Sequence, residues 1–105
     1  MTIFSFISVA PEKALAVSLV ADIRKSLPPD LLVTRRRIVS VNKVTRLLET
    51  TYDLARSHQK QRKLGFIRRA VLANSLKWEL KEAGYPDDFI DVAIEGLVIA
   101  LSRKT

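Results

Sequence analysis

The sequence contains one histidine, His58, and no cysteine, so few side chains are suited to acid–base or nucleophilic chemistry near neutral pH. A catalytic histidine also needs an orienting acid and a nucleophile close by. His58 instead extends an apolar stripe containing Thr51 and Ala55 by one helical turn, which predicts a partly buried structural role. We therefore expect no catalytic residues and a protein that is not an enzyme.

Carboxylates gather at two places near the end of the chain. Glu79 and Glu82 form one group, and Asp87, Asp88 and Asp91 form the other. Solvated helix faces and helix-end capping explain both groups, because carboxylates stabilise the positive end of a helix. Nothing makes these oxygens converge as a hard metal would require, cysteine-ligated zinc is excluded, and no Gly-rich phosphate loop occurs. We expect no metal site and no cofactor.

The strongest chemical feature is the positive charge in the middle of the chain. The net charge is +7 and the pI is about 10.2. Residues 35–69 hold 11 Lys and Arg against two acids, whereas residues 1–34 are neutral and residues 70–105 carry a net −2. This balance favours nucleic acid, an anionic membrane or an acidic protein as the partner.

The basic residues form two groups at the ends of one predicted helix. Roughly 25 Å of helix separates position 43 from position 60, so the groups could bridge phosphates of a duplex without reading bases. Double-stranded RNA is recognised by shape in this way, which favours double-stranded or structured RNA slightly over specific DNA. The predicted nucleic-acid-binding residues are Arg35, Arg36, Arg37, Lys43, Arg46, Arg56, Lys60, Arg62, Lys63, Arg68 and Arg69.

A solvated helix face is the simpler explanation, since Glu49 can pair with Arg46 and Asp53 with Arg56. Two acids cannot neutralise eleven cations, however, and arginine, the better phosphate ligand, outnumbers lysine 8 to 3 in residues 35–69. The alternative function is a helical adaptor or inhibitor, of the viral accessory or bacterial regulator kind, that docks on an acidic or apolar protein surface. A helix-turn-helix and a membrane-surface helix rank lower.

Apolar periodicity predicts an all-α domain spanning residues 1–105, with helices over 11–26, 41–63, 66–83 and 86–103 and a short turn over 30–33. Pro28 and Pro29 end the first helix, Ser40 is a candidate N-cap, and Gly65 and Gly84 are candidate C-terminal caps. Tyr52, Phe66 and Trp78 lie near apolar rows and are expected in the core. So is the stripe formed by Val41, Val44, Leu47, Leu48, Leu54 and Ala55.

The helices over 11–26 and 86–103 are apolar around most of their circumference, more than four short helices can hide. We therefore expect a homodimer through these two helices, with Gly96 allowing close approach of the second copy. The predicted interface residues are Leu15, Leu19, Phe89, Val92, Gly96 and Ile99.

No apolar run reaches the length of a membrane span. Residues 1–10 are apolar but lack the basic start of a secretory signal, and the absence of cysteine suits a reducing compartment. We expect an intracellular, cytoplasmic location, in the host cell if the protein is viral.

Overall fold

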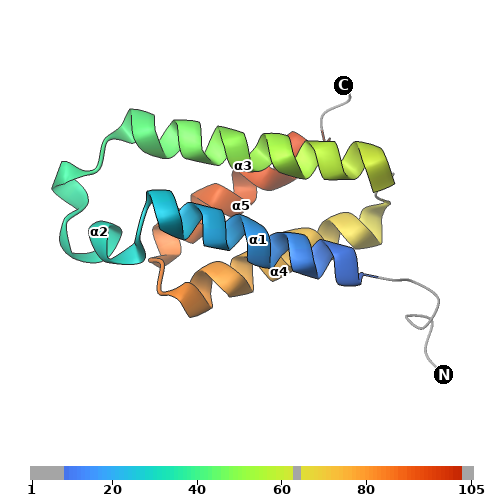
Figure 1. The fold of residues 1–105 in the computed structure, drawn as a ribbon, viewed down its shortest axis with the longest axis horizontal. Coiled ribbons are helices and arrows are strands. Elements are labelled where there is room, and N and C mark those ends of the chain that lie inside the picture. The colour runs from blue at the N-terminus through green and yellow to red at the C-terminus, as the bar shows by residue number, and fades with distance from the viewer. Residues whose placement is uncertain (1–8, 63–64, 103–105) are drawn as a thin grey trace.

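The computed structural model describes residues 9–62 and 65–102, which form helices and no strands. The helices are α1 (Ala10–Ser26), α2 (Pro29–Thr34), α3 (Val41–Arg62), α4 (Phe66–Ala83) and α5 (Asp87–Ser102), with a 3₁₀ turn η2 (Arg36–Ile38) before α3 (Figure 1). The all-α prediction is confirmed, and the short turn expected over 30–33 is a six-residue helix. The expected helix ends at 63 and 103 lie outside the described residues.

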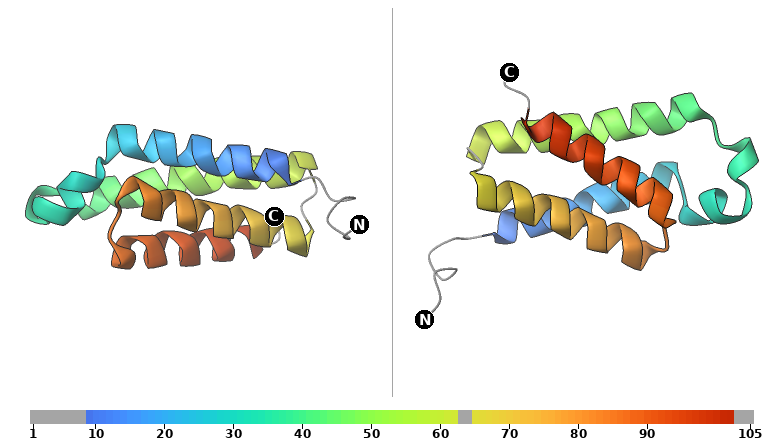
Figure 2. Two further views of the ribbon diagram at one scale, coloured as in Figure 1. Left: turned by 90° about the horizontal axis from the view of Figure 1, so that it is seen from below. Right: turned by 180° about the vertical axis from the view of Figure 1, so that it is seen from behind.

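Four long helices form a bundle in which α1 and α4 run one way and α3 and α5 run the other (Figures 1 and 2). The main packing pairs are α1 with α4, α4 with α5, α5 with α3, and α3 with α1, so α3 and α4 occupy opposite corners. The core between them contains Ala16, Leu19, Val20, Ile23, Leu27, Leu32, Leu48, Ala55, Leu72, Leu76, Leu80, Tyr85, Phe89, Ile90, Ala93, Leu97 and Leu101.

Local sequence explains most of the helix ends. Pro11 lies in the first turn of α1, where a missing N–H costs nothing, and Pro28 follows its last turn. The Ser40 hydroxyl accepts a bond from the Lys43 N–H at 3.4 Å, as an N-cap does. Gly84 ends α4 with φ +99°, the left-handed conformation that glycine favours.

Gly65 does not have the conformation predicted for it. Its φ of −79° and ψ of −179° describe extended backbone at the N-cap of α4, which any residue adopts. The predicted left-handed cap at this position is therefore wrong. Chain direction changes between α3 and α4 without a left-handed glycine at position 65.

Several apolar side chains predicted for the core lie outside it. Phe66 is 78% exposed and Trp78 is 52% exposed, and Val41 and Leu54 also face solvent. Leu72, Leu76 and Leu80 set the buried face of α4. Trp78 is two residues, or about 200° of helix, from Leu76 and so points away from that face. Tyr52 is half-buried between helices.

Candidate nucleic-acid interface

Four cations cluster where α2 leads into α3, at one end of the bundle. Arg35 and Arg37 lie on either side of η2's first residue, and Lys43 and Arg46 lie in the first two turns of α3. All four are exposed, and none forms an ion pair in the described part of the chain. We call Arg35, Arg37, Lys43 and Arg46 the entry cluster. Their charges are available to a partner because no carboxylate among the residues that the structure describes pairs with them.

Arg36 belongs to the same sequence run but has an internal role. Its guanidinium donates to both carboxylate oxygens of Asp88, at 2.5 and 3.0 Å, and so ties the α2–α3 connection to the start of α5. This hydrogen-bonded pair raises the pKa of Arg36 and lowers the pKa of Asp88. Arg36 therefore positions its neighbours and is a poorer candidate for phosphate binding than the sequence suggests.

The basic residues at the other end of α3 do not form one free surface. Arg56 pairs with Asp53 three residues earlier, as predicted, whereas Lys60 is exposed without an ion pair in the described residues. Arg68 and Arg69 are half-buried, and the Arg69 Nε lies below the surface. The Arg62 side chain and Lys63 are outside the described residues. The two predicted groups of basic residues therefore differ in solvent exposure. The entry cluster is more exposed than the described basic residues at the other end of α3.

The outer face of α3 links the entry cluster to Lys60. Arg46, Asp53 and Lys60 recur every seven residues and so lie on one side of the helix, with about 21 Å between the first and the last. Asp53 interrupts the row, although Arg56 pairs with it. Glu49, which was expected to pair with Arg46, forms no ion pair among the described residues. The positive charge is therefore concentrated at the two ends of this face.

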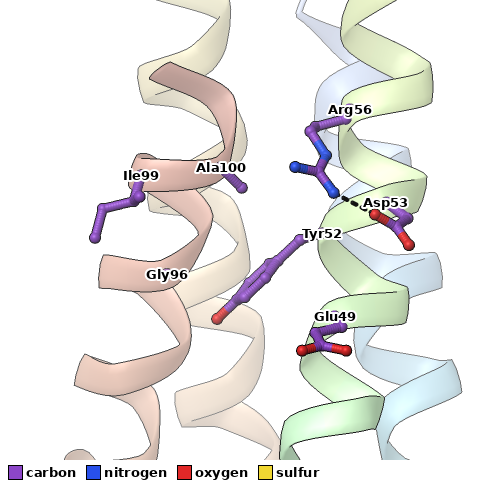
Figure 3. Close-up of a pocket in the computed structure, with 7 residues that line it drawn as sticks. All are labelled: Glu49, Tyr52, Asp53, Arg56, Gly96, Ile99 and Ala100. Atoms are coloured by element: carbon purple, nitrogen blue, oxygen red, sulfur yellow. Dashed lines mark hydrogen bonds and ion pairs between the residues drawn. The ribbon is translucent and has the colours of Figure 1, made fainter. Parts of the chain in front are cut away.

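Tyr52 crosses from α3 to α5 and occupies the space beside Gly96 (Figure 3). Its hydroxyl donates to the carbonyl of Ala93 at 2.9 Å, and burial raises its pKa to about 12. A Cβ at position 96 would lie 2.2 Å from that hydroxyl oxygen. Gly96 therefore makes room for Tyr52 of the same chain, a role that the sequence-based prediction of a partner helix there missed.

The other predicted interface residues divide into two groups. Leu19 and Phe89 are buried in the chain's own core and Leu15 is half-buried against it, so the first two have no surface to offer a second copy. Val92 and Ile99 are 59% and 56% exposed on α5. The exposed acid Glu95 lies between them along α5, and the exposed Asp91 directly precedes Val92. Like charges there disfavour pairing of α5 with a second α5.

His58 does have an acidic partner, which the sequence analysis did not foresee. Its Nε2 lies 2.6 Å from an oxygen of Glu12 on α1, and the Glu12 side chain is fully buried. Glu12 is an acid among the apolar residues of α1, one turn before the buried Ala16. An acidic residue among apolar ones is the sequence feature that could have identified this buried pair. The pair sits where α1 and α3 pack, and its position agrees with a structural role for His58.

Within residues 9–62 and 65–102, no group of three His, Asp or Glu side chains is arranged to hold a metal ion. None of the helices described is long and apolar enough to cross a membrane. Comparison of the chain with protein-family models, with curated proteins and with solved structures gives no match.

Proposed function

We propose that this protein is a non-enzymatic nucleic-acid-binding protein whose entry cluster and outer α3 face contact phosphates. One observation carries the proposal: Arg35, Arg37, Lys43 and Arg46 are exposed together at one end of α3, and no acid of the described chain neutralises them. Lys60 adds a cation further along the same helix face.

The geometry favours recognition of backbone over recognition of bases. A helix-turn-helix needs two consecutive helices packed together, with the second one in the major groove. Here α3 and α4 lie at opposite corners of the bundle. The cations instead form one cluster at the start of α3, with Lys60 about 21 Å beyond Arg46 on the same helix face, an arrangement that suits phosphates on either side of a groove. Affinity would come from counterion release.

Among nucleic acids, we propose double-stranded or structured RNA ahead of specific DNA. Single-strand binders stack bases on exposed aromatic side chains beside a basic groove. The exposed aromatics Phe66 and Trp78 lie on α4, away from the entry cluster. The interface proposed on α3 thus has charge without a stacking platform, which favours duplex shape and backbone contacts.

The test compares two variants with equal net charge. In the first, the four cations of the entry cluster are changed to glutamine. In the second, four exposed cations away from α3 are changed to glutamine: Arg24, Lys25, Lys77 and Lys81. Each variant lowers the net charge from +7 to +3. Binding to duplex RNA, duplex DNA and single strands is measured by fluorescence anisotropy at a fixed salt concentration.

We expect the entry-cluster variant to lose most duplex binding and the matched variant to keep most of it. Equal losses would mean that net charge alone governs binding and would contradict a site on α3. Absence of binding by the parent at physiological salt would favour the adaptor function, with an acidic protein surface as the partner of the same cations.

A further inference from the structure

One end of the bundle brings four helix termini together. Helices α1 and α4 begin there and α3 and α5 end there, so this end lies opposite the entry cluster (Figures 1 and 2). The Gln59 amide donates to the Leu101 carbonyl at 3.1 Å, and His58 lies 2.6 Å from Glu12, so α3 is joined here to both α5 and α1. We call this end the tip, which comprises residues 9–16, 55–61, 65–73 and 96–102.

Apolar side chains of the tip are exposed to solvent. Phe66, the first residue of α4, is 78% exposed, and the neighbouring Ile67 is 43% exposed. Val98 of α5 is 48% exposed and lines a cavity of about 280 Å³ with Phe66. The other residues that line this cavity are Arg69, Ala70, Ala73, Leu101 and Ser102. The described helices therefore leave an aromatic ring and two aliphatic side chains partly or largely uncovered.

The exposed charge of the tip is positive. Glu12 is the only acid in the tip, and its side chain is fully buried beside His58. Lys60 is exposed, and Arg69 lines the cavity next to Phe66. The buried Nε of Arg69 has no hydrogen-bond partner within the described part of the chain. The exposed apolar groups thus lie beside cations, with no exposed acid in the tip to balance them.

We infer that the tip docks on the surface of a bilayer that contains anionic phospholipids. Phe66 and Ile67 enter the boundary between head groups and acyl chains, where burial of apolar area favours binding. Lys60 and Arg69 contact the lipid phosphates, and each cation near an anionic surface adds to the attraction. The cavity between α4 and α5 offers an apolar surface to an acyl chain beside Phe66.

The combination of side chains distinguishes a bilayer from other anionic partners. Nucleic acid would match the cations, but bases stack on aromatic rings, so the aliphatic Ile67 and Val98 would stay in water. An acidic protein would need a hollow shaped to receive Phe66, whereas a fluid bilayer adapts to a protruding side chain. The inference does not rest on the proposed nucleic-acid function, because the entry cluster lies at the other end of α3 (Figure 1).

Vesicle sedimentation at physiological salt provides the first test. One set of vesicles contains phosphatidylcholine and phosphatidylserine in equal parts, and the other contains phosphatidylcholine alone. We expect the parent to bind the first set and to bind the second much more weakly. Phe66→Ala should weaken binding to the anionic vesicles about tenfold. Ile38→Ala, at a side chain that is 70% exposed at the opposite end of the bundle, should bind like the parent.

A pair of charge variants separates the tip from net charge. Lys60→Gln with Arg69→Gln should weaken binding about fivefold for each cation removed. Arg24→Gln with Lys25→Gln, at the opposite end of the bundle, lowers the net charge equally, from +7 to +5, and should lose much less. Circular dichroism confirms that each variant is folded, and Lys60→Gln alone, at an exposed side chain, repeats the comparison if the Arg69 change unfolds the protein.

Tryptophan fluorescence reports which part of the protein meets the lipid. The chain has one tryptophan, so Phe66→Trp combined with Trp78→Phe places a single reporter at the tip. Its emission should shift to shorter wavelength when anionic vesicles are added. The parent's Trp78 is twelve residues, or about 18 Å, further along α4, and its emission should not shift.

Several results would overturn the inference. They are a parent that does not bind anionic vesicles, Phe66→Ala binding as tightly as the parent, equal losses for the two charge variants, and unshifted emission from a tryptophan at position 66. Ile38→Ala weakening binding as much as Phe66→Ala would also contradict it. Single-strand nucleic-acid binding that Phe66→Ala abolishes, with vesicles left unbound, would make the tip a base-stacking surface instead.

Discussion

Replacing Gly96 with alanine tests how α3 and α5 pack. In an ordinary helix interior this change stabilises a protein by about 1 kcal/mol, because glycine has the greater conformational freedom to lose. Here the new Cβ would lie 2.2, 2.6 and 2.9 Å from the Oη, Cζ and Cε2 atoms of Tyr52. Such distances are impossible, so the tyrosine has to leave its place.

The cost follows from what Tyr52 loses. Its hydrogen bond to the Ala93 carbonyl contributes about 1 kcal/mol. Moving a half-buried ring into water costs about 1 to 2 kcal/mol more. After subtracting the helix-propensity gain of about 1 kcal/mol, we expect Gly96→Ala to destabilise the protein by about 1 to 2 kcal/mol. For a domain of this size that lowers Tm by about 5 to 10 °C.

A double-mutant cycle in urea isolates the effect. In a Tyr52→Ala background the collision is absent, and Gly96→Ala should then stabilise by about 1 kcal/mol. In a Tyr52→Phe background the collision with the ring persists, and the change should still destabilise. If Gly96→Ala stabilises the protein with Tyr52 in place, the packing described here is refuted.

Two further predictions concern buried ionisable groups. Replacing His58 with leucine removes one partner of the buried Glu12 side chain, and we expect a loss of about 2 kcal/mol in urea denaturation. Glu12→Gln should partly relieve this loss, and additive effects of the two changes would contradict the coupling. Burial raises the pKa of Tyr85 to about 12. Tyr85 therefore ionises first in the unfolded chain, near pH 10, and the stability that it contributes below that pH should fall by about 2 to 3 kcal/mol as pH rises to about 12. Because burial raises the pKa of Tyr52 to about 12 as well, the contribution of Tyr85 is measured by urea denaturation across this range as the difference between the parent and a Tyr85→Phe variant.

Helix positions were largely predictable because most of the helix ends have a local cause. Pro28, Ser40 and Gly84 act through their own backbone or hydrogen bonds, so position in sequence is enough to place them. The exposure of Trp78 was less predictable, because it depends on which face of α4 meets α1 and α5. The sequence pattern around an apolar side chain two residues from a buried row is the same whether or not another helix packs against that side chain.

The site was predictable as a region but not residue by residue. Charge density locates residues 35–69, yet the partner of Arg36 is Asp88, fifty-two residues away, and only the tertiary fold brings them together. The same holds for Glu12 with His58 and for Gly96 with Tyr52. The pair Asp53–Arg56 is within one helical turn, and it was predicted correctly.

The salt dependence of binding tests the central claim most directly, because each phosphate contact with duplex DNA contributes about −0.9 to the slope of log K against log salt. The entry cluster supplies four cations. Changing all four to glutamine should therefore make the slope shallower by about 3.6, whereas the matched Arg24, Lys25, Lys77 and Lys81 variant should keep the parent's slope. If the two variants show the same slope, the entry cluster does not contact phosphates and the proposed function is wrong.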